Sequence, residues 1–468
     1  MKKKIKTVKK VKVIKKSMEK QKQGLSAFFK AENIALIGAS HEPNKIGNVL
    51  MKNLLKNKTV FPVNPNADVI MNRHSFKSVL EIEDKIDLAI IAVKAEFVPE
   101  VVEQCGKKKI KNVIIISSGF SEIGNEKLNE QLRLKLEKYN IKCIGPNCLG
   151  IYDSYSELDA IFLTPQRLKR PIQGKISFVS QSGALGGAML DNMAEKRMGI
   201  SKFISYGNAL NLNECDYLEY LMNDENTGVV CLYVEQIKDG KRFLEVAKKL
   251  TKSKPLIVFK GGVTEAGNKA ALSHTGSLAG DSKIYEGVFK QVGAIQVENL
   301  EDLFSVANLF EKFGNLKKGV KIQTITNGGG YGIICTDQIA KNNLKLAEFS
   351  SKTREKLKKE LPAIINIGNP IDLMGDVTNE RYKIVLNACL EDSNIDIILL
   401  VVLYQTPLIN EDIVDVILEA YEKNKKPIVV VIPKSSESSV TDSLSEKGVV
   451  LFEFPENAIR VLKKFIEG

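Results

Sequence analysis

The residue best suited to nucleophilic chemistry is His274, one of three histidines in the chain. It lies in the segment NKAALSHTGSLAGD, whose small residues would let a bulky charged group approach the imidazole. An imidazole with one nitrogen free and the other held by a carboxylate is a good nucleophile toward a phosphoryl group. Glu235, at the end of the apolar run in LYVEQIKDG, is a candidate for that carboxylate. A lone histidine is more often structural than catalytic, so spacing alone leaves this pairing open.

Four glycine-rich segments have the composition of anion-binding turns. They are IALIGASHEPNKIG at 34–47, FVSQSGALGG at 178–187, SHTGSLAGD at 273–281 and ITNGGGYG at 325–332. Glycine lets backbone N–H groups approach an anion, and a helix N-terminus adds about half a positive charge. A tight connection from strand to helix also needs glycine. Each turn by itself could therefore be either an anion site or only a structural connection.

The first of these turns is not the GxGxxG fingerprint of dinucleotide-binding proteins. No acidic residue follows at the distance where a ribose partner is expected, and FPVNPNAD places Asn64 there instead. This weighs against NAD and leaves room for another adenine nucleotide, such as coenzyme A. A GxxxxGK[ST] motif is also missing from the sequence, so no Walker-type ATP site is visible.

Short apolar runs alternate with amphipathic segments and would position these turns. Near-continuous apolar strands separated by helices indicate parallel sheets that are covered on both faces. We expect strands at 34–37, 60–63, 88–93, 113–116, 143–144, 175–179, 202–205, 229–234, 256–260, 321–326, 395–403 and 427–432. We expect helices at 126–139, 184–196, 215–223 and 240–252, and a helix that begins near residue 46.

The net charge of +12 is concentrated in a tail. Residues 1–22 hold 11 Lys and one Glu, whereas the rest of the chain has 57 basic and 55 acidic residues. We expect a solvated, disordered extension over residues 1–24. A weak patch for RNA or an anionic membrane is the alternative, and its binding would be salt-sensitive and unspecific. The charge therefore predicts no specific nucleic-acid function.

The cysteines and the hydropathy pattern indicate a cytoplasmic protein. The seven cysteines form no CxxC pair and show no zinc spacing, which suits reduced thiols and no metal site. No apolar run reaches the roughly 20 residues that a membrane span needs, and no apolar segment of a secretory signal follows the basic N-terminus. A length of 468 residues predicts about three domains.

Eight motifs occur in an order that resembles a known family. They are ENIALIGASHEPNKIG, SSGFSEIG, IGPNCLGI, FVSQSGALGG, SYGNALNLNECDYLEYL, YVEQIKDGKRF, KPLIVFKGGVTEAGNKAALSHTGSLAGD and TNGGGYGIICTD. Together they resemble the alpha subunit of the ADP-forming (NDP-forming) acyl-CoA synthetases, the archaeal acetate–CoA ligases, which are relatives of succinyl-CoA synthetase. The resemblance covers residues 25–468 and is specific, because many motifs share one order.

The resemblance implies an α/β fold of three domains. Residues 25–150 would be a Rossmann-type CoA-binding domain. Two flavodoxin-like domains with doubly wound parallel sheets would follow, a ligase-CoA domain at 151–300 that carries the phosphohistidine and a second ligase domain at 301–468. Val263 stands where relatives often carry a basic residue, which puts one anion contact in doubt.

The resemblance also implies a reaction. Acyl-CoA, phosphate and ADP would be converted reversibly to the acid, CoA and ATP, through an acyl phosphate and a phosphohistidine. His274 and Glu235 would be the catalytic pair. The residues expected to bind coenzyme A are Gly38, Ala39, Ser40, Lys45, Ile46, Gly47, Asn64 and Val93. The residues expected to bind the phosphoryl group are Gln181, Ser182, Gly183, Asn327, Gly328, Gly329 and Gly330.

The family's ATP-grasp domain has no counterpart in the sequence. The resemblance therefore implies a separate ATP-grasp beta subunit that holds ADP or ATP with Mg²⁺, in an assembly of two alpha and two beta chains. Three other functions remain as alternatives: a non-catalytic CoA-binding regulator of the same fold, a protein acetyltransferase, and a nicotinamide dehydrogenase. The last two are disfavoured because no acetyltransferase module follows and GxGxxG is missing.

Overall fold

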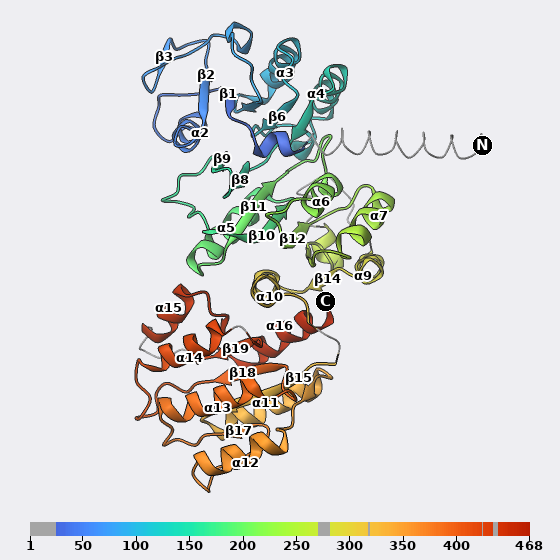
Figure 1. Cartoon of the computed structure of the whole chain (residues 1–468). Helices are drawn as coiled ribbons and strands as arrows, with labels where there is room; N and C mark the ends of the chain where they lie inside the picture. The colour runs from blue at the N-terminus through green and yellow to red at the C-terminus, as the bar shows by residue number, and fades with distance from the viewer. Residues whose placement is uncertain (1–24, 270–280, 317–318, 424, 434–438) are drawn as a thin grey trace, which may run out of the picture. The chain divides into compact units, whose positions relative to one another are not determined.

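The structure is a computed structural model that describes residues 25–269, 281–316, 319–423, 425–433 and 439–468 (Figure 1). His274 and the Lys-rich tail lie outside the described residues. The chain forms two compact units. The first contains residues up to Glu195 together with Gly199–Glu298, and the second contains Lys196–Met198 with Asn299–Gly468.

The first unit contains a sheet of five parallel strands in the order β2-β1-β5-β6-β7. The strands are β1 (Asn33–Ile37), β2 (Thr59–Val63), β5 (Leu88–Ile91), β6 (Asn112–Ile115) and β7 (Lys142–Ile144). A separate two-stranded hairpin pairs β3 (Val69–Ile70) with β4 (Arg73–His74). Nearly all residues of β1, β5 and β6 are buried, which explains their continuous apolar sequences.

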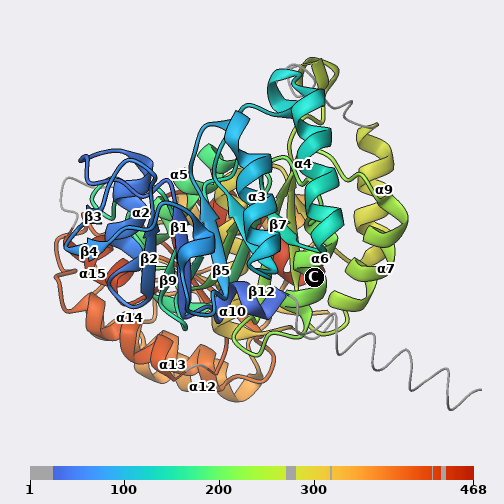
Figure 2. The ribbon, with the colours of Figure 1, turned by 90° about the horizontal axis from the view of Figure 1, so that it is seen from above.

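Helices cover both faces of this sheet. Helix α2 (Ile46–Leu54) packs on one face, where Leu50 shares a core with Leu36. On the other face, α3 (Val98–Lys107) and α4 (Glu126–Tyr139) pack over Ile37 and Ile91. Figure 2 shows α3 and α4 side by side. In open sheets of this kind, ligands bind beyond the carboxyl ends of the strands.

The first unit also contains a seven-stranded sheet in the order β14-β13-β12-β10-β11-β8-β9. The strands are β8 (Ile151–Asp153), β9 (Leu158–Asp159), β10 (Gln173–Ser180), β11 (Ile200–Ser205), β12 (Val229–Val234), β13 (Leu256–Lys260) and β14 (Ile295–Val297). The helices are α5 (Gly183–Glu195), α6 (Glu214–Met222), α7 (Gly240–Leu250) and α9 (Ser282–Val292). The expected parallel sheet is confirmed, with the addition of antiparallel β8 and β9 at one edge.

The second unit contains a six-stranded parallel sheet in the order β16-β15-β18-β19-β20, with β17 also paired to β15. The strands are β15 (Lys321–Thr326), β16 (Lys345–Leu346), β17 (Ile371–Asp372), β18 (Ile397–Val401), β19 (Ile428–Val431) and β20 (Leu451–Phe452). The helices are α10 (Leu300–Phe313), α11 (Gly329–Lys341), α12 (Ser351–Glu360), α13 (Asn379–Glu391), α14 (Ile413–Glu422), α15 (Ser439–Glu446) and α16 (Pro455–Glu467).

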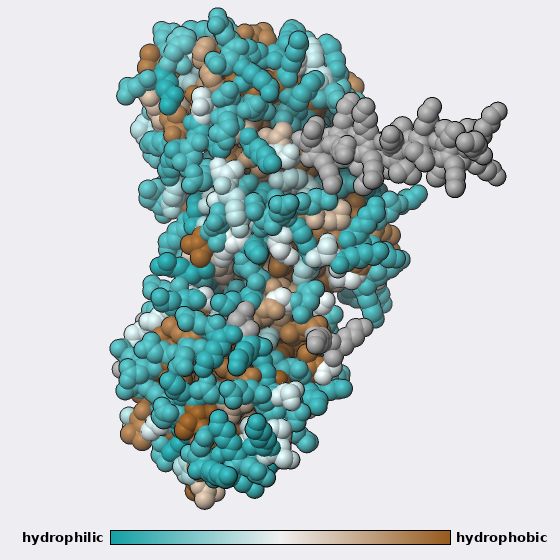
Figure 3. All heavy atoms as spheres, viewed as in Figure 1, coloured by the Kyte–Doolittle hydropathy of each residue, from teal (hydrophilic) through white to brown (hydrophobic). Residues whose placement is uncertain are grey.

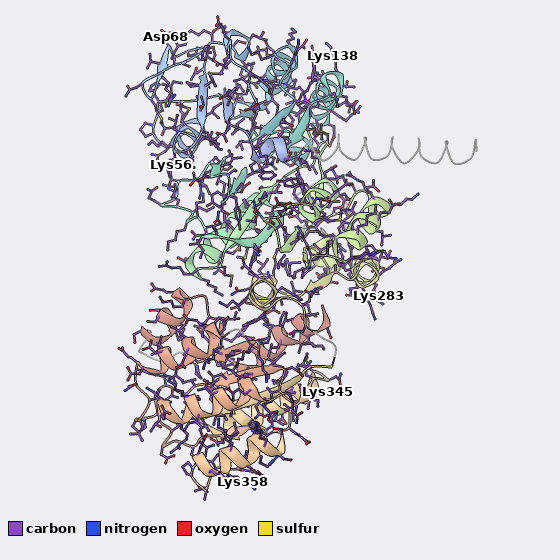
Figure 4. All side chains as sticks on the ribbon, in the orientation of Figure 1. Lys56, Asp68, Lys138, Lys283, Lys345 and Lys358 are labelled. Atoms are coloured by element: carbon purple, nitrogen blue, oxygen red, sulfur yellow. The ribbon has the colours of Figure 1, made fainter. Side chains whose placement is uncertain are left out.

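Charged side chains occupy the outside of the units. Hydrophilic residues cover most of the face seen in Figure 3, and the labelled charged residues of Figure 4, such as Lys283 on α9, extend outward. All seven cysteines are buried and free. In the described ranges, no helix combines the length and the apolar character needed to cross a bilayer.

Candidate active site

A cavity of about 1270 Å³ lies within the first unit. Its walls come from loops that follow six parallel strands of the two sheets. The lining includes Val93 and Lys94 after β5, Ile116–Ser118 after β6, Asn147–Leu149 after β7, Gln181–Ala184 after β10, Gly207–Leu210 after β11, and Glu235 and Lys238 after β12. The carboxyl ends of both sheets therefore meet around one site.

The turn after β1 is built by close backbone contacts. Gly38 has φ +91°, and a Cβ there would lie 2.3 Å from the carbonyl oxygen of Ala92. A Cβ on Gly47 would lie 1.9 Å from the carbonyl oxygen of Gly38. Only glycine fits at these positions, because the start of α2 packs directly against the end of β1.

Of the eight residues expected to bind coenzyme A, Ile46 and Val93 line the cavity. The others shape the turn beside it. Asn64 donates from Nδ2 to the carbonyl oxygen of Ala39 at 2.8 Å. Ser40 Oγ accepts from the backbone N–H of Glu42 at 3.0 Å, and Lys45 Nζ donates to the Glu42 carboxylate at 2.6 Å.

The turn after β10 brings the predicted phosphoryl-binding residues of this unit against Glu235. Gln181 Oε1 accepts from the backbone N–H groups of Glu235, at 2.8 Å, and Gln236, at 3.2 Å. Ser182 Oγ accepts from the N–H of Leu185 at 3.3 Å. Gly183 begins α5, whose first turn contains no acidic residue. The start of this helix therefore presents its positive end to the cavity, and no acidic side chain of its own first turn offsets that charge.

Glu235 is a buried carboxylate that keeps one oxygen free. Only 8% of the residue is exposed. Tyr233 donates its hydroxyl to Oε1 at 3.2 Å, whereas Oε2 has no hydrogen-bond partner among the described residues. A buried charge without partners is costly. Oε2 is therefore placed to accept a hydrogen bond from a group such as an imidazole N–H.

The other predicted phosphoryl-binding turn belongs to the second unit. Asn327 Oδ1 accepts from the N–H of Leu403 at 2.8 Å, and its Nδ2 donates to the carbonyl oxygen of Leu403 at 3.2 Å and to Thr406 Oγ1 at 3.1 Å. Gly328 caps α11, and Gly329 and Gly330 form its first turn. The Asn327 side chain thus ties the end of β15 to the loop after β18.

Sequence reasoning missed the wall that follows β6. Ser117, Ser118 and Ser121 line the cavity together with Glu122. Glu122 accepts from the N–H of Gly119 at 2.5 Å and from Asn208 Nδ2 at 2.5 Å. Partial burial opposes ionisation, but these donors hold the pKa of Glu122 below its ordinary value. The motif SSGFSEIG was the available signal for this wall.

A second acid of the first unit behaves differently. Glu214, the first residue of α6, is almost fully buried. Burial raises its pKa to about 7, and the negative charge of Asp216 adds to this effect, against the opposing hydrogen bond from its own backbone N–H. The hydroxyl groups of its neighbours Tyr206 and Tyr217 have no hydrogen-bond partner in the described part of the chain.

Family models match the regions of the three large sheets. The CoA binding domain matches residues 32–154, the succinyl-CoA ligase like flavodoxin domain matches 173–310, and the ligase-CoA domain matches 322–466. With the strand ends converging on one cavity, these matches place the chain in the class of succinyl-CoA ligase-like proteins that bind coenzyme A.

The relatives narrow the class to a family. The chain is 38% identical over 442 residues to the Pyrococcus furiosus protein named acetate–CoA ligase [ADP-forming] II subunit alpha, covering 92% of this chain and 95% of that protein. It is 46% identical over 350 residues, 75% of its length, to acetate–CoA ligase [ADP-forming] of Methanocaldococcus jannaschii, and that match spans about half (49%) of the relative. The chain belongs to the ADP-forming acetate–CoA ligase family.

A solved structure shows the same fold. The dinucleotide-forming acetyl-coenzyme A synthetase 1 of Ca. Korarchaeum cryptofilum, in complex with phosphate and ADP, superposes with a TM-score of 0.88 at 33% identity. The match covers 95% of this chain and 96% of that chain. The α/β architecture expected from the motifs is thus confirmed.

Proposed function

We propose that the chain is the alpha subunit of an ADP-forming acyl-CoA ligase. It would convert acyl-CoA, phosphate and ADP reversibly to the acid, CoA and ATP. The observation that carries the proposal is Glu235: a buried carboxylate with a free oxygen, tied through Gln181 to the start of α5, in the wall of a cavity of about 1270 Å³. Residues 25–150 would bind CoA, and residues 151–300 and 301–468 would form the two ligase domains.

The first half-reaction releases CoA. A phosphate oxygen attacks the thioester carbonyl carbon, the C–S bond breaks, and CoA leaves as a thiolate that takes up a proton. The product is an acyl phosphate. Backbone N–H groups of Ser182 and Gly183 and the positive end of α5 suit the developing charge on the phosphoryl oxygens.

The second half-reaction passes through His274. Its free nitrogen attacks the phosphorus, the P–O bond to the acyl group breaks, and the carboxylate leaves. Glu235 Oε2 would hold the other imidazole nitrogen and stabilise its positive charge. ADP then takes the phosphoryl group from the phosphohistidine and becomes ATP. In the second unit, the turn at Asn327–Gly330 would bind phosphate through the N–H groups of Gly329 and Gly330 at the start of α11.

The nucleotide would bind to a partner chain. Two Pyrococcus furiosus relatives that match over nearly their whole length are named as alpha subunits, and the M. jannaschii relative is about twice as long as its match. The alpha-subunit names support a separate partner subunit, whereas the longer relative has room for the same function in one chain. The proposed partner is an ATP-grasp beta subunit that holds ADP or ATP with Mg²⁺, in an assembly of two alpha and two beta chains.

Co-expression with an ATP-grasp subunit tests the proposal. The complex is supplied with ADP, phosphate and a panel of acetyl, branched-chain, aryl and succinyl thioesters, and ATP release is measured. We expect ATP from at least one thioester and none from the His274→Ala complex, which should still bind CoA. Binding of CoA without any ATP formation would instead favour a non-catalytic regulator.

A further inference from the structure

Lys260, the last residue of β13, is a buried cation that the proposed reaction leaves without a role. Only 3% of the residue is exposed. β13 pairs in parallel with β12, and Lys260 lies opposite Val234, the residue before Glu235. The N–H of Gly261 donates to the carbonyl oxygen of Val234 at 3.0 Å. The backbone ends of the strands that carry the buried ammonium and the buried carboxylate thus lie side by side, and a Cβ on Gly261 would lie 2.7 Å from the Tyr233 hydroxyl that donates to Glu235.

Tyr285 fixes this arrangement from α9. The Lys260 ammonium lies over the Tyr285 ring, 4.6 Å from its centroid, and also donates to the carbonyl oxygen of Gly261. The Tyr285 hydroxyl accepts from the N–H of Ile237 at 3.2 Å. One aromatic side chain therefore contacts the ammonium with its ring and the turn after Glu235 with its hydroxyl.

The charges of Lys260 and Glu235 act on each other without a contact ion pair. Burial lowers the pKa of Lys260 to about 8, and the negative charge of Glu235 opposes this effect. The Glu235 carboxylate has a single hydroxyl donor among the described residues. A buried carboxylate with so few donors is costly, and a positive charge nearby offsets part of this cost.

We propose that Lys260 is a positioning residue for Glu235: its ammonium, fixed by Tyr285 and Gly261, balances the Glu235 carboxylate and keeps it ready to accept a hydrogen bond from an imidazole. The catalytic consequence rests on the proposed function. Lys260 makes and breaks no bond in the reaction and acts only through Glu235.

The charge coupling is tested without any enzyme assay. In full-length protein with ¹³Cε-labelled lysine, NMR follows the titration of Lys260, whose signal is assigned by its loss in Lys260→Met. We expect a midpoint near the pKa of about 8 in the wild type. Glu235→Gln should lower it by about one pH unit, because a favourable negative charge is removed. An identical midpoint in the two proteins would overturn the proposal.

The catalytic role is tested in the complex with the ATP-grasp subunit. Lys260→Met should lower kcat about tenfold with KM for acyl-CoA nearly unchanged, and Lys260→Arg should restore most of the loss. Lys254→Met is the matched control. Lys254 lies just before β13 at its other end and donates to the carbonyl oxygens of Leu221, at 2.7 Å, and Asp224, at 2.6 Å.

The outcomes separate the two proposals. Equal kcat losses in the Lys260→Met and Lys254→Met complexes, or none in either, would overturn the role of Lys260. If the wild-type complex forms no ATP from any thioester, the proposed function fails, whereas the NMR titration still decides whether Lys260 and Glu235 are coupled.

Discussion

The turns after β10 and β15 use the same bonding plan in two different units. In the first, the Gln181 side chain accepts from the N–H of Glu235, just after β12. In the second, the Asn327 side chain accepts from the N–H of Leu403, shortly after β18. β10 pairs with β12 in parallel, as β15 pairs with β18. An amide side chain thus joins each glycine-rich turn to the end of the neighbouring strand.

The difference lies in the residue that receives this bond. Glu235 is an acid with a free oxygen beside a cavity, whereas Leu403 is apolar and fills the space beside Gly328, where a Cβ would lie 2.4 Å from its Cδ1. The shared plan accounts for the shape of the turn in both units. Under the proposed function, the single side chain after the neighbouring strand gives only the first turn a carboxylate that can orient an imidazole.

Glu235→Leu makes the first turn resemble the second and should have the largest effect. We expect ATP formation by the complex to fall at least about 100-fold, because the imidazole loses its orienting carboxylate. Thermal stability should be unchanged or higher, since an apolar side chain replaces an incompletely bonded buried charge. The control, Leu403→Met, should retain activity within about twofold. A Glu235→Leu complex of near wild-type activity would contradict the claim that Glu235 distinguishes the first turn from the second.

Removing the amide bridges separates their roles. Gln181→Ala leaves the N–H groups of Glu235 and Gln236 without their acceptor, and Asn327→Ala does the same to Leu403. Each should cost about 1–3 kcal/mol of unfolding free energy, seen by hydrogen exchange as faster opening of the mutated unit only. Gln181→Ala should also lower kcat at least about tenfold, because Glu235 is no longer held in place. If either substitution accelerated hydrogen exchange equally in both units, the assignment of each bridge to its own unit would be contradicted.

The two units should also respond differently to pH. Glu214 in the first unit has a pKa of about 7 in the folded chain, above its unfolded value of 4.5, so folding takes up a proton between these values and stability falls as pH rises. In the second unit, burial opposes ionisation of Asp392, but its hydrogen-bond donors hold its pKa below the ordinary value, and the Arg381 side chain lowers the pKa of Asp376. These two groups therefore make stability fall as pH falls. In the wild type, the free energy of unfolding of the first unit should fall by up to about 3 kcal/mol between pH 5 and 8, and Glu214→Gln should abolish this fall.

Hydrogen exchange of each unit measures this effect at several pH values. The matched control is Asp376→Asn, which should leave the pH response of the first unit unchanged. A first unit whose stability does not change between pH 5 and 8, or a Glu214→Gln variant with the wild-type slope, would contradict the assignment.

The local pattern of strands and turns could be predicted from the sequence. Val229–Val234, Leu256–Lys260 and Lys321–Thr326 are strands at the expected residues, because buried parallel strands have continuous apolar sequences. The antiparallel β8 and β9 were not expected, since strands of two or three residues carry no periodic signal.

The site itself could be predicted only in part. The proximity of Gln181 to Glu235 follows from strand order, since β10 and β12 are neighbours although 54 residues separate the two side chains. The loop at 162–168 lines the cavity but has no periodic pattern to place it. Glu214 and Lys260 have charged side chains that a sequence would assign to the surface, and only the tertiary packing buries them.

The most direct measurement is the transfer of phosphate to the chain. Full-length protein is incubated with ³²P-labelled phosphate and, in separate reactions, with each thioester of the acetyl, branched-chain, aryl and succinyl panel, and the protein is analysed for bound label. We expect acid-labile label on the wild type, none on His274→Ala, and labelling at least about tenfold slower on Glu235→Gln. Label that persists after His274→Ala, or a wild-type chain that never acquires label from any thioester, would contradict the account.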